Sequence, residues 1–153
     1  MFDIVIIGAG IVGLAIARSI AEKTHKSVLV IEKEESFGRG ISSRNSEVIH
    51  SGIYYEPESL KEKYCSRGRD MTYKFCEQYN IWVNQCGKMV VGNSHQLDGL
   101  EALYKNAQNI GVPDIRLLEQ KEINSLEPNV EADIALQVGC TGIVSAHDLM
   151  AAF

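Results

Sequence analysis

Two short, almost wholly apolar runs near the start of the chain flank a longer segment of mixed character. Residues 3–7 and 27–31 are rich in β-branched side chains, a pattern typical of strands buried on both faces of a parallel sheet. Residues 11–23 between them are rich in Ala, Ile and Leu, and Gly13 is their one Gly or Pro, which favours a helix. This order predicts a right-handed βαβ unit.

The rest of the chain alternates helical and strand-like patterns. The segment from Ser59 to Tyr79 is predicted to be a long amphipathic helix, because Leu60, Tyr64, Met71 and Phe75 fall on one helical face. The other predicted elements are a loop at 33–42, a short helix at 44–50, a hairpin within 82–91, a helix from a Ser94 cap to about 109, a strand at 115–118, a helix at 120–126, a strand at 134–138 and a final helix capped by Ser145.

Composition and charge exclude several classes of protein. The 153 residues, 45% of them hydrophobic, suffice for about one ordinary domain, and the net charge of -5 gives no reason to expect a nucleic-acid partner. The four cysteines form no Cys-x-x-Cys pair and no histidine lies at ligand spacing from them, so no metal site is predicted. No run approaches the length of a transmembrane helix. A cytoplasmic protein with reduced thiols is expected, and any contact with an inner membrane would be peripheral.

Three glycines, Gly8, Gly10 and Gly13, follow the first predicted strand and open the first predicted helix. In this context Gly8 allows a tight turn, Gly10 lets the backbone approach a pyrophosphate, and Gly13 allows close packing of helix on strand. The backbone amides at the helix start, including those of Ile11 and Val12, then face the phosphates. The segment therefore predicts a dinucleotide site.

An acidic residue, Glu32, ends the second apolar run, 19 residues after Gly13. A carboxylate there accepts hydrogen bonds from the adenosine ribose, and Lys33 beside it is a further candidate contact. Because a 2'-phosphate would be repelled, NADP is disfavoured, whereas FAD and NAD both remain.

The next segment separates the two cofactors by resemblance. Residues 38–55, GRGISSRNSEVIHSGIYY, resemble the flavin-contacting segment of the D-amino-acid oxidase superfamily of FAD-dependent oxidoreductases. Within this superfamily, residues 42–55, 86–91 and 141–144 are most similar to the L-2-hydroxyglutarate dehydrogenase or oxidase subfamily. The resemblance extends over essentially the whole chain. Ser145 departs from the aspartate expected after 141–144.

The resemblance implies FAD as cofactor and a set of flavin contacts. Ser42 and Ser43 would lie against the pyrophosphate or ribityl chain, and the flavin ring would be lined by part of the segment from Arg44 to Tyr54, with these candidates: Arg44, Ser46, His50, Ser51 and Gly52. The implied reaction moves a hydride from C2 of a 2-hydroxy acid, best matched by L-2-hydroxyglutarate, to flavin N5, and gives the 2-oxo acid.

Two side chains are candidates for the chemistry itself. His50 is the candidate base for the hydroxyl proton, because imidazole titrates near neutral pH; the alternative is a histidine that only bonds the flavin or a backbone group. Arg44 is the candidate for a bidentate contact with a substrate carboxylate. Arg67 is a second candidate, although a solvated helix residue is favoured there.

The fold class expected is α/β: a Rossmann-like FAD-binding βαβ unit with a parallel sheet, joined to an α+β part of a substrate domain. Residues 1–80 are assigned to the FAD-binding domain, 81–140 to the start of the substrate domain, and 141–153 to a return toward the FAD-binding domain. The chain is expected to be the N-terminal part of a longer enzyme, to bind FAD weakly and to turn over little substrate alone, the missing C-terminal portion being its partner. Two alternatives stay open: an amine or amino-acid oxidase of the glycine or sarcosine type, and a non-catalytic nucleotide-binding domain.

Overall fold

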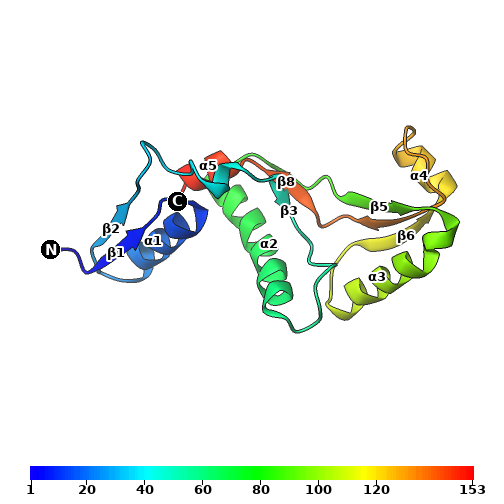
Figure 1. The fold of residues 1–153 in the computed structure, drawn as a ribbon, viewed down its shortest axis with the longest axis horizontal. Helices are drawn as coiled ribbons and strands as arrows, with labels where there is room; N and C mark the ends of the chain where they lie inside the picture. The colour runs from blue at the N-terminus through cyan, green and yellow to red at the C-terminus, as the bar shows by residue number, and fades with distance from the viewer. The chain divides into compact units, whose positions relative to one another are not determined.

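Two units make up the chain in the computed structural model, which describes every residue from Met1 to Phe153 (Figure 1). The first has a two-stranded sheet, and the second has two three-stranded sheets. The first unit comprises residues 1–47, 76–82 and 144–153, and the second comprises 48–75 and 83–143. Helix α2 (Leu60–Tyr79) contributes residues to both units. No helix of the structure has both the length and the apolar character that a bilayer crossing needs.

The first unit begins with the predicted βαβ arrangement. Its elements are β1 (Ile4–Ile7), α1 (Ile11–Lys23) and β2 (Val28–Ile31). The two strands are parallel, with Ile4 opposite Val28 and Ile7 opposite Ile31. The α/β fold class is thus confirmed, with antiparallel sheets added in the second unit.

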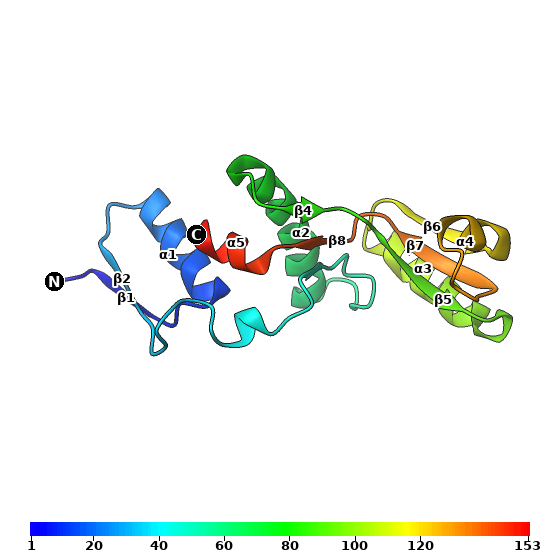
Figure 2. The ribbon, with the colours of Figure 1, turned by 90° about the horizontal axis from the view of Figure 1, so that it is seen from above.

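The expectation that both strands are buried on both faces is wrong. Alternate side chains point to opposite faces of a strand, and α1 covers one of those faces (Figure 2). The other face leaves Val5 51%, Ile7 87% and Ile31 48% exposed, because no further helix lies over this two-stranded sheet.

The segment after β2 departs from the predicted helix at 44–50. One turn of 3-10 helix, η1 (Ile41–Ser43), lies earlier, and residues 48–49 form strand β3 (Val48–Ile49). The reason is local: the Asn45 side chain accepts a 2.7 Å hydrogen bond from the Glu47 amide, and Glu47 has a φ of 57°. A left-handed residue and a side-chain turn end helical geometry.

The first unit closes with the short helix α5 (Ala146–Ala151). As predicted, the Ser145 hydroxyl caps it by accepting a 3.3 Å hydrogen bond from the Asp148 amide. Arg18 of α1 donates to the carbonyl of Ala152 just after α5 and to the Tyr79 hydroxyl, which ties the helices of this unit together.

The second unit contains an antiparallel sheet in the order β5-β7-β6. Its strands are β5 (Lys88–Gly92), β6 (Ile115–Glu119) and β7 (Ile134–Val138), and its helices are η2 (Ser94–Gln96), α3 (Leu97–Asn109) and α4 (Gln120–Leu126). Leu136 and Val138 pack with Leu100 and Ala107 of α3, whereas Ala135 packs on the other side of β7. Side chains of β7 thus enter both cores of this unit.

The cap at the start of η2 is Asn93 rather than the predicted Ser94. The Asn93 side chain and the Gln96 side chain form a reciprocal capping box, with Gln96 accepting a 3.0 Å bond from the Asn93 amide. Ser94 instead donates its own amide to the Asp133 carboxylate at 2.8 Å. At the other end, Gly111 has a φ of 68°, which fits the predicted helix stop.

The predicted hairpin within 82–91 is also wrong. Strand β4 (Val83–Asn84) lies next to β8 (Gly142–Val144), and β5 pairs with β7, so β4 and β5 belong to different sheets. Between them the Gly87 amide donates to the Thr141 carbonyl at 2.8 Å, and the Gln85 side chain donates to the Gly139 carbonyl at 3.2 Å. Each of the two strands therefore lies beside a later strand, β4 beside β8 and β5 beside β7, and the two do not pair with each other.

Helix α2 begins one residue after the predicted start, and three of the four residues on its predicted apolar face are exposed, while Phe75 is half-buried. Leu60, Tyr64 and Met71 are 69%, 60% and 58% exposed. The other face carries Arg69, which is 7% exposed, and Tyr73, whose hydroxyl donates to the Cys140 carbonyl at 3.2 Å. Polar anchoring thus prevails over the apolar stripe in the orientation of this helix.

Candidate functional site

The glycine loop between β1 and α1 has the geometry of a close backbone approach. Gly8 has a φ of 104°, which favours glycine, and its amide donates to the Ile31 carbonyl at 2.7 Å. A Cβ at Gly13 would lie 2.1 Å from the Gly8 carbonyl oxygen, so only glycine fits there. Gly10 occupies the N-cap position of α1. Because it has no side chain, it makes no capping hydrogen bond to the first amides of the helix.

The Glu32 carboxylate lies at the mouth of this helix. Its Oε2 accepts a 2.8 Å bond from the Ala9 amide, and its Oε1 accepts bonds from the amides of Lys33 at 2.8 Å and Glu34 at 3.1 Å. These amides, that of Ala9 first, hold the pKa of Glu32 below its ordinary value. Each carboxylate oxygen has two lone-pair sites, so Oε2 can still accept a bond from a ligand hydroxyl.

A cavity of about 450 Å³ opens at this loop. Its lining includes the predicted residues Gly8, Gly10, Glu32, Lys33 and Ser42. The Ser42 hydroxyl accepts a 3.0 Å bond from the Ile11 amide, which places the η1 turn against the start of α1. The side chain of Val12, the next residue, is 68% exposed.

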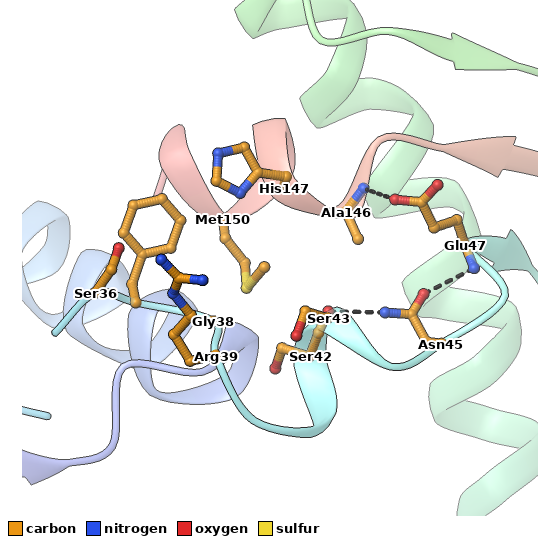
Figure 3. Close-up of a pocket in the computed structure, with 11 residues that line it drawn as sticks. Ser36, Gly38, Arg39, Ser42, Ser43, Asn45, Glu47, Ala146, His147 and Met150 are labelled. Atoms are coloured by element: carbon orange, nitrogen blue, oxygen red, sulfur yellow. Dashed lines mark hydrogen bonds between the residues drawn. The ribbon is translucent and has the colours of Figure 1, made fainter. Parts of the chain in front are cut away.

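A second cavity of about 570 Å³ lies between the 36–47 segment and α5 (Figure 3). Ser42 lines both cavities. The wall of the second cavity is formed by residues of the 36–47 segment and of α5, namely Ser36, Phe37, Gly38, Arg39, Ser42, Ser43, Asn45, Glu47, Ala146, His147 and Met150.

Several of these lining residues were not predicted from the sequence. The Phe37 and His147 rings stack with centroids 5.3 Å apart, and Glu47 accepts a 2.9 Å bond from the Ala146 amide. These contacts join segments about a hundred residues apart, and no short motif in either segment indicates the pairing. The Ser145 cap signal was the one sequence feature that pointed to structure at this end of the cavity.

The other predicted flavin contacts of the first unit are exposed. Arg44 has no ion pair in the structure, and the side chains of Arg44 and Ser46 both face solvent. Ser43 donates its hydroxyl to the Gly40 carbonyl at 3.1 Å. Arg44 is therefore available to an anionic ligand.

The remaining predicted residues belong to the second unit. His50 is exposed, and its carbonyl accepts a 3.4 Å contact from the Cys65 thiol. Ser51 is fully buried and its hydroxyl has no hydrogen-bond partner, while Gly52 has a φ of 93°. Arg67 is exposed on α2, in keeping with the favoured reading of a solvated helix residue.

Residues 3–153 match the protein family described as FAD dependent oxidoreductase. The chain belongs to this family of FAD-dependent oxidoreductases. It is 43% identical to the mitochondrial L-2-hydroxyglutarate dehydrogenase of Homo sapiens and 42% identical to that of Arabidopsis thaliana, over 99% and 97% of its length. These alignments cover 33% and 31% of the two relatives, so the chain spans about a third of the length of the curated relatives it matches.

The fold is that of solved FAD-dependent oxidoreductases. Glycine oxidase from Geobacillus kaustophilus matches with a TM-score of 0.86 and 24% identity, over 99% of this chain and 42% of that one. L-alpha-Glycerophosphate Oxidase from Mycoplasma pneumoniae, solved with FAD bound, matches with a TM-score of 0.89 and 23% identity, over 99% and 41%. At these identities the likeness concerns the fold alone.

The donor set of the glycine loop fits the cofactor that defines the FAD-dependent oxidoreductases. No Cβ covers Gly8 or Gly10, and an added Cβ at Gly10 would lie 3.0 Å from the Ser42 hydroxyl. The first amides of a helix lack intrahelical partners and suit a diphosphate, although here the Ile11 amide already donates to the Ser42 hydroxyl. A carboxylate on the adjacent strand suits a ribose diol. The residues present in the first unit therefore fit the ADP half of FAD.

Proposed function

We propose that this chain forms an FAD-binding part of an enzyme that oxidises the C2 hydroxyl of a 2-hydroxy acid, with L-2-hydroxyglutarate as the substrate. The observation that carries the proposal is the contact between the glycine loop and Glu32, in which the Ala9 amide donates to the carboxylate at 2.8 Å. The substrate follows from relatives of 38–43% identity, all named L-2-hydroxyglutarate dehydrogenase. Because the chain spans about a third of them, the activity is proposed for the whole enzyme.

The residues proposed to hold FAD come from three segments of the first unit. The glycine loop and the start of α1 would bind the pyrophosphate, and the end of β2 would bind the adenosine ribose. The η1 turn would contact the pyrophosphate or the ribityl chain. In that order the residues are Gly8, Gly10, Ile11, Val12 and Gly13; Glu32 and Lys33; and Ser42 and Ser43. Bound FAD would supply the acceptor for the hydride that leaves the substrate.

The chain's own contribution to the chemistry is a base and an anion-binding group. The His50 imidazole is proposed to accept the hydroxyl proton of the substrate, and its exposed side chain is free to reach a ligand. Arg44, exposed and without an ion pair, is proposed to hold a substrate carboxylate by a bidentate contact. Ser46, Ser51 and Gly52 are proposed to line the flavin ring, and the unpartnered Ser51 hydroxyl offers a hydrogen bond there.

Titration of FAD into the purified protein, followed by quenching of flavin fluorescence, tests the cofactor proposal. Glu32→Ala should weaken FAD binding by roughly 10- to 100-fold, the range expected when a charge-assisted hydrogen bond is lost. Glu35→Ala is the matched control, because Glu35 is an exposed acid on the same loop. Equal affinities for the two variants, or no FAD binding by the wild type, would reject the proposal.

The class of substrate is tested by anaerobic bleaching of the flavin in the whole FAD-loaded enzyme, to which the activity is assigned. Reduction by L-2-hydroxyglutarate, and not by glycine or sarcosine, is expected. The opposite pattern would establish an amine oxidase of the glycine or sarcosine type. A flavin that no substrate reduces would favour a nucleotide-binding domain without catalysis, and native mass measurement would then show whether a partner chain is required.

A further inference from the structure

The backbone of residues 50–55 is held in place by other parts of the second unit. Just before it, Ile49 of β3 lies opposite Gly142 of β8 and is 7% exposed. The carbonyl of His50 then accepts a 3.4 Å contact from the Cys65 thiol of α2. Both contacts lie within the second unit, and together they fix the backbone at His50 and just before it.

A tight turn, residues 52–55, follows the histidine. The Tyr55 amide donates to the Gly52 carbonyl at 2.9 Å, and Gly52 has a φ of 93°, which favours glycine. Ile53 inside the turn is fully buried in the apolar core of the second unit. The 52–55 turn is thus closed by its own hydrogen bond and anchored by one apolar side chain.

A single side chain of α3 spans the 52–55 turn. The Asn106 carboxamide nitrogen donates to the Ile53 carbonyl at 2.9 Å and to the Tyr55 carbonyl at 3.0 Å. A carboxamide has two N–H donors, so these bonds use both of them. The next residue, Ala107, is fully buried in the same core as Ile53, which fixes α3 there. Asn106 therefore connects the turn to a rigid element.

Two large side chains on this anchored backbone are exposed. The His50 side chain is exposed, and the Tyr54 side chain is 61% exposed, with Lys88 Nζ 4.6 Å from its ring centroid. A connecting loop needs no fixed place for its exposed side chains. A group that acts on a ligand does, because its surroundings must hold it to within about 0.5 Å of the productive geometry.

Asn106 provides the stronger of the two side-chain anchors of this backbone. The Cys65 thiol, which contacts the His50 carbonyl, is a weak donor. No other side chain of the structure donates a hydrogen bond to the backbone of residues 50–55. Loss of the Asn106 carboxamide would leave the carbonyls of Ile53 and Tyr55 without these donors, so the turn and the histidine before it would shift.

We propose that Asn106 is a positioning residue that acts through His50. It holds the 52–55 turn, and thereby the histidine that precedes the turn, so that the imidazole can accept the hydroxyl proton of the substrate. The inference rests on the proposed function and deepens it, because it names the side chain that keeps the proposed base in place. In this role Asn106 itself contacts neither the substrate nor the flavin.

A double-mutant cycle in the whole FAD-loaded enzyme tests the inference. The measured quantity is the limiting rate of anaerobic flavin reduction by L-2-hydroxyglutarate. Asn106→Ala should lower this rate about 10- to 100-fold and change the half-saturating substrate concentration by less than about threefold, because the base is displaced and the carboxylate contact is kept. In a His50→Gln background the same change should lower the rate by less than about twofold, since no base remains to be positioned.

Two further variants and one measurement on the wild type separate positioning from a general loss of stability. Asn106→Asp keeps the shape of the side chain and lacks both donors, so it should lower the rate at least as much as Asn106→Ala does. Asn109→Ala removes an exposed asparagine of the same helix and should leave the rate unchanged. In the wild type, the carboxamide protons of Asn106 should exchange with solvent at least about tenfold more slowly than those of Asn109, as read by NMR.

The same measurements distinguish a failure of the inference from a failure of the proposed function. If His50→Gln slows flavin reduction but Asn106→Ala has no effect, or the same effect in both backgrounds, the inference fails and the proposed function stands. Carboxamide protons of Asn106 that exchange as fast as those of Asn109 would also overturn the inference. If L-2-hydroxyglutarate does not reduce the flavin, or if His50→Gln is as fast as the wild type, the proposed role of the base fails and the inference fails with it.

Discussion

At the scale of single residues, Gly13 is the position of the glycine loop with the least room for a side chain. A Cβ there would lie 2.1 Å from the Gly8 carbonyl oxygen and 3.4 Å from the Ile6 side chain, so either α1 or the loop would have to move. This is a backbone clash, which a flexible side chain cannot relieve. The third glycine of the motif is thus explained by the packing of helix on strand.

Gly13→Ala should therefore destabilise the fold by about 1–3 kcal/mol, the usual cost of overpacking. Gly99→Ala is the matched control, because Gly99 lies within α3 and an added Cβ there meets nothing within 4 Å. That change should stabilise the protein by about 0.4–1 kcal/mol, since alanine has less freedom in the unfolded chain. Urea denaturation measures both, and a Gly13→Ala variant as stable as the wild type would contradict the packing argument.

The Glu32 carboxylate predicts a pH dependence of stability. Its pKa in the folded chain is lowered from 4.5, chiefly by the Ala9 amide, so the folded state favours the ionised form. The contribution is present above pH 4.5 and is lost as the pH falls through the lower folded-state pKa.

Glu32→Gln should lower the urea midpoint at pH 7, and its difference from the wild type should shrink as the pH falls below 4.5. Glu35→Gln should leave the urea midpoint at pH 7 unchanged, because Glu35 is exposed. A Glu32→Gln effect that is constant between pH 7 and pH 3 would refute this account.

At the scale of elements, local sequence patterns predicted the bounds of those helices and strands that are determined by residues within a few positions. The sequence-based bounds of α1, α4 and β7 agree with the structure, because apolar periodicity, Pro128 and the flanking polar residues act within a few positions. Partner choice is not local. The runs around Cys86 resembled a hairpin, but β4 and β5 lie beside the distant strands β8 and β7. The orientation of α2 likewise depends on Arg69 and Tyr73 contacting Cys140, about seventy residues away.

The start of η2 provides a test of cap assignment between adjacent residues. Asn93→Ala should destabilise the second unit by about 1 kcal/mol, because the capping box with Gln96 is lost. Ser94→Ala should change stability by less than about 0.5 kcal/mol, since the Ser94 contact to Asp133 uses the backbone amide, which alanine retains. Urea denaturation of the two variants is the measurement. Equal destabilisation by both would show that the cap is wrongly assigned.

At the scale of the whole molecule, the candidate site was predictable only in part. The glycine motif and Glu32 were found from sequence because their spacing is fixed by one βαβ unit. Ser42 was implied by resemblance, and the structure shows what positions it: its hydroxyl accepts from the Ile11 amide, 31 residues earlier. The stacking of Phe37 on His147 and the Glu47–Ala146 bond join remote segments, and such contacts follow from the fold and not from any local signal.

The distribution of apolar surface leads to the last prediction. The first unit exposes Val5, Ile7 and Ile31 on one face of its sheet, and the second unit exposes Leu60, Tyr64 and Met71 on one face of α2. Contiguous apolar faces of this kind mark surfaces that bind other apolar groups. The protein should therefore bind the dye anilinonaphthalene sulfonate in its folded state.

Ile7→Thr should reduce that dye fluorescence and change the free energy of unfolding by less than about 0.5 kcal/mol, because Ile7 is 87% exposed and loses no packing. Leu136→Ala is the contrasting variant: Leu136 is fully buried, so its truncation should cost about 2–5 kcal/mol. Fluorescence titration and urea denaturation separate the two effects. If Ile7→Thr were as destabilising as Leu136→Ala, the outer face of the sheet would have to be packed in solution, and the exposed sheet face described for the first unit would be wrong.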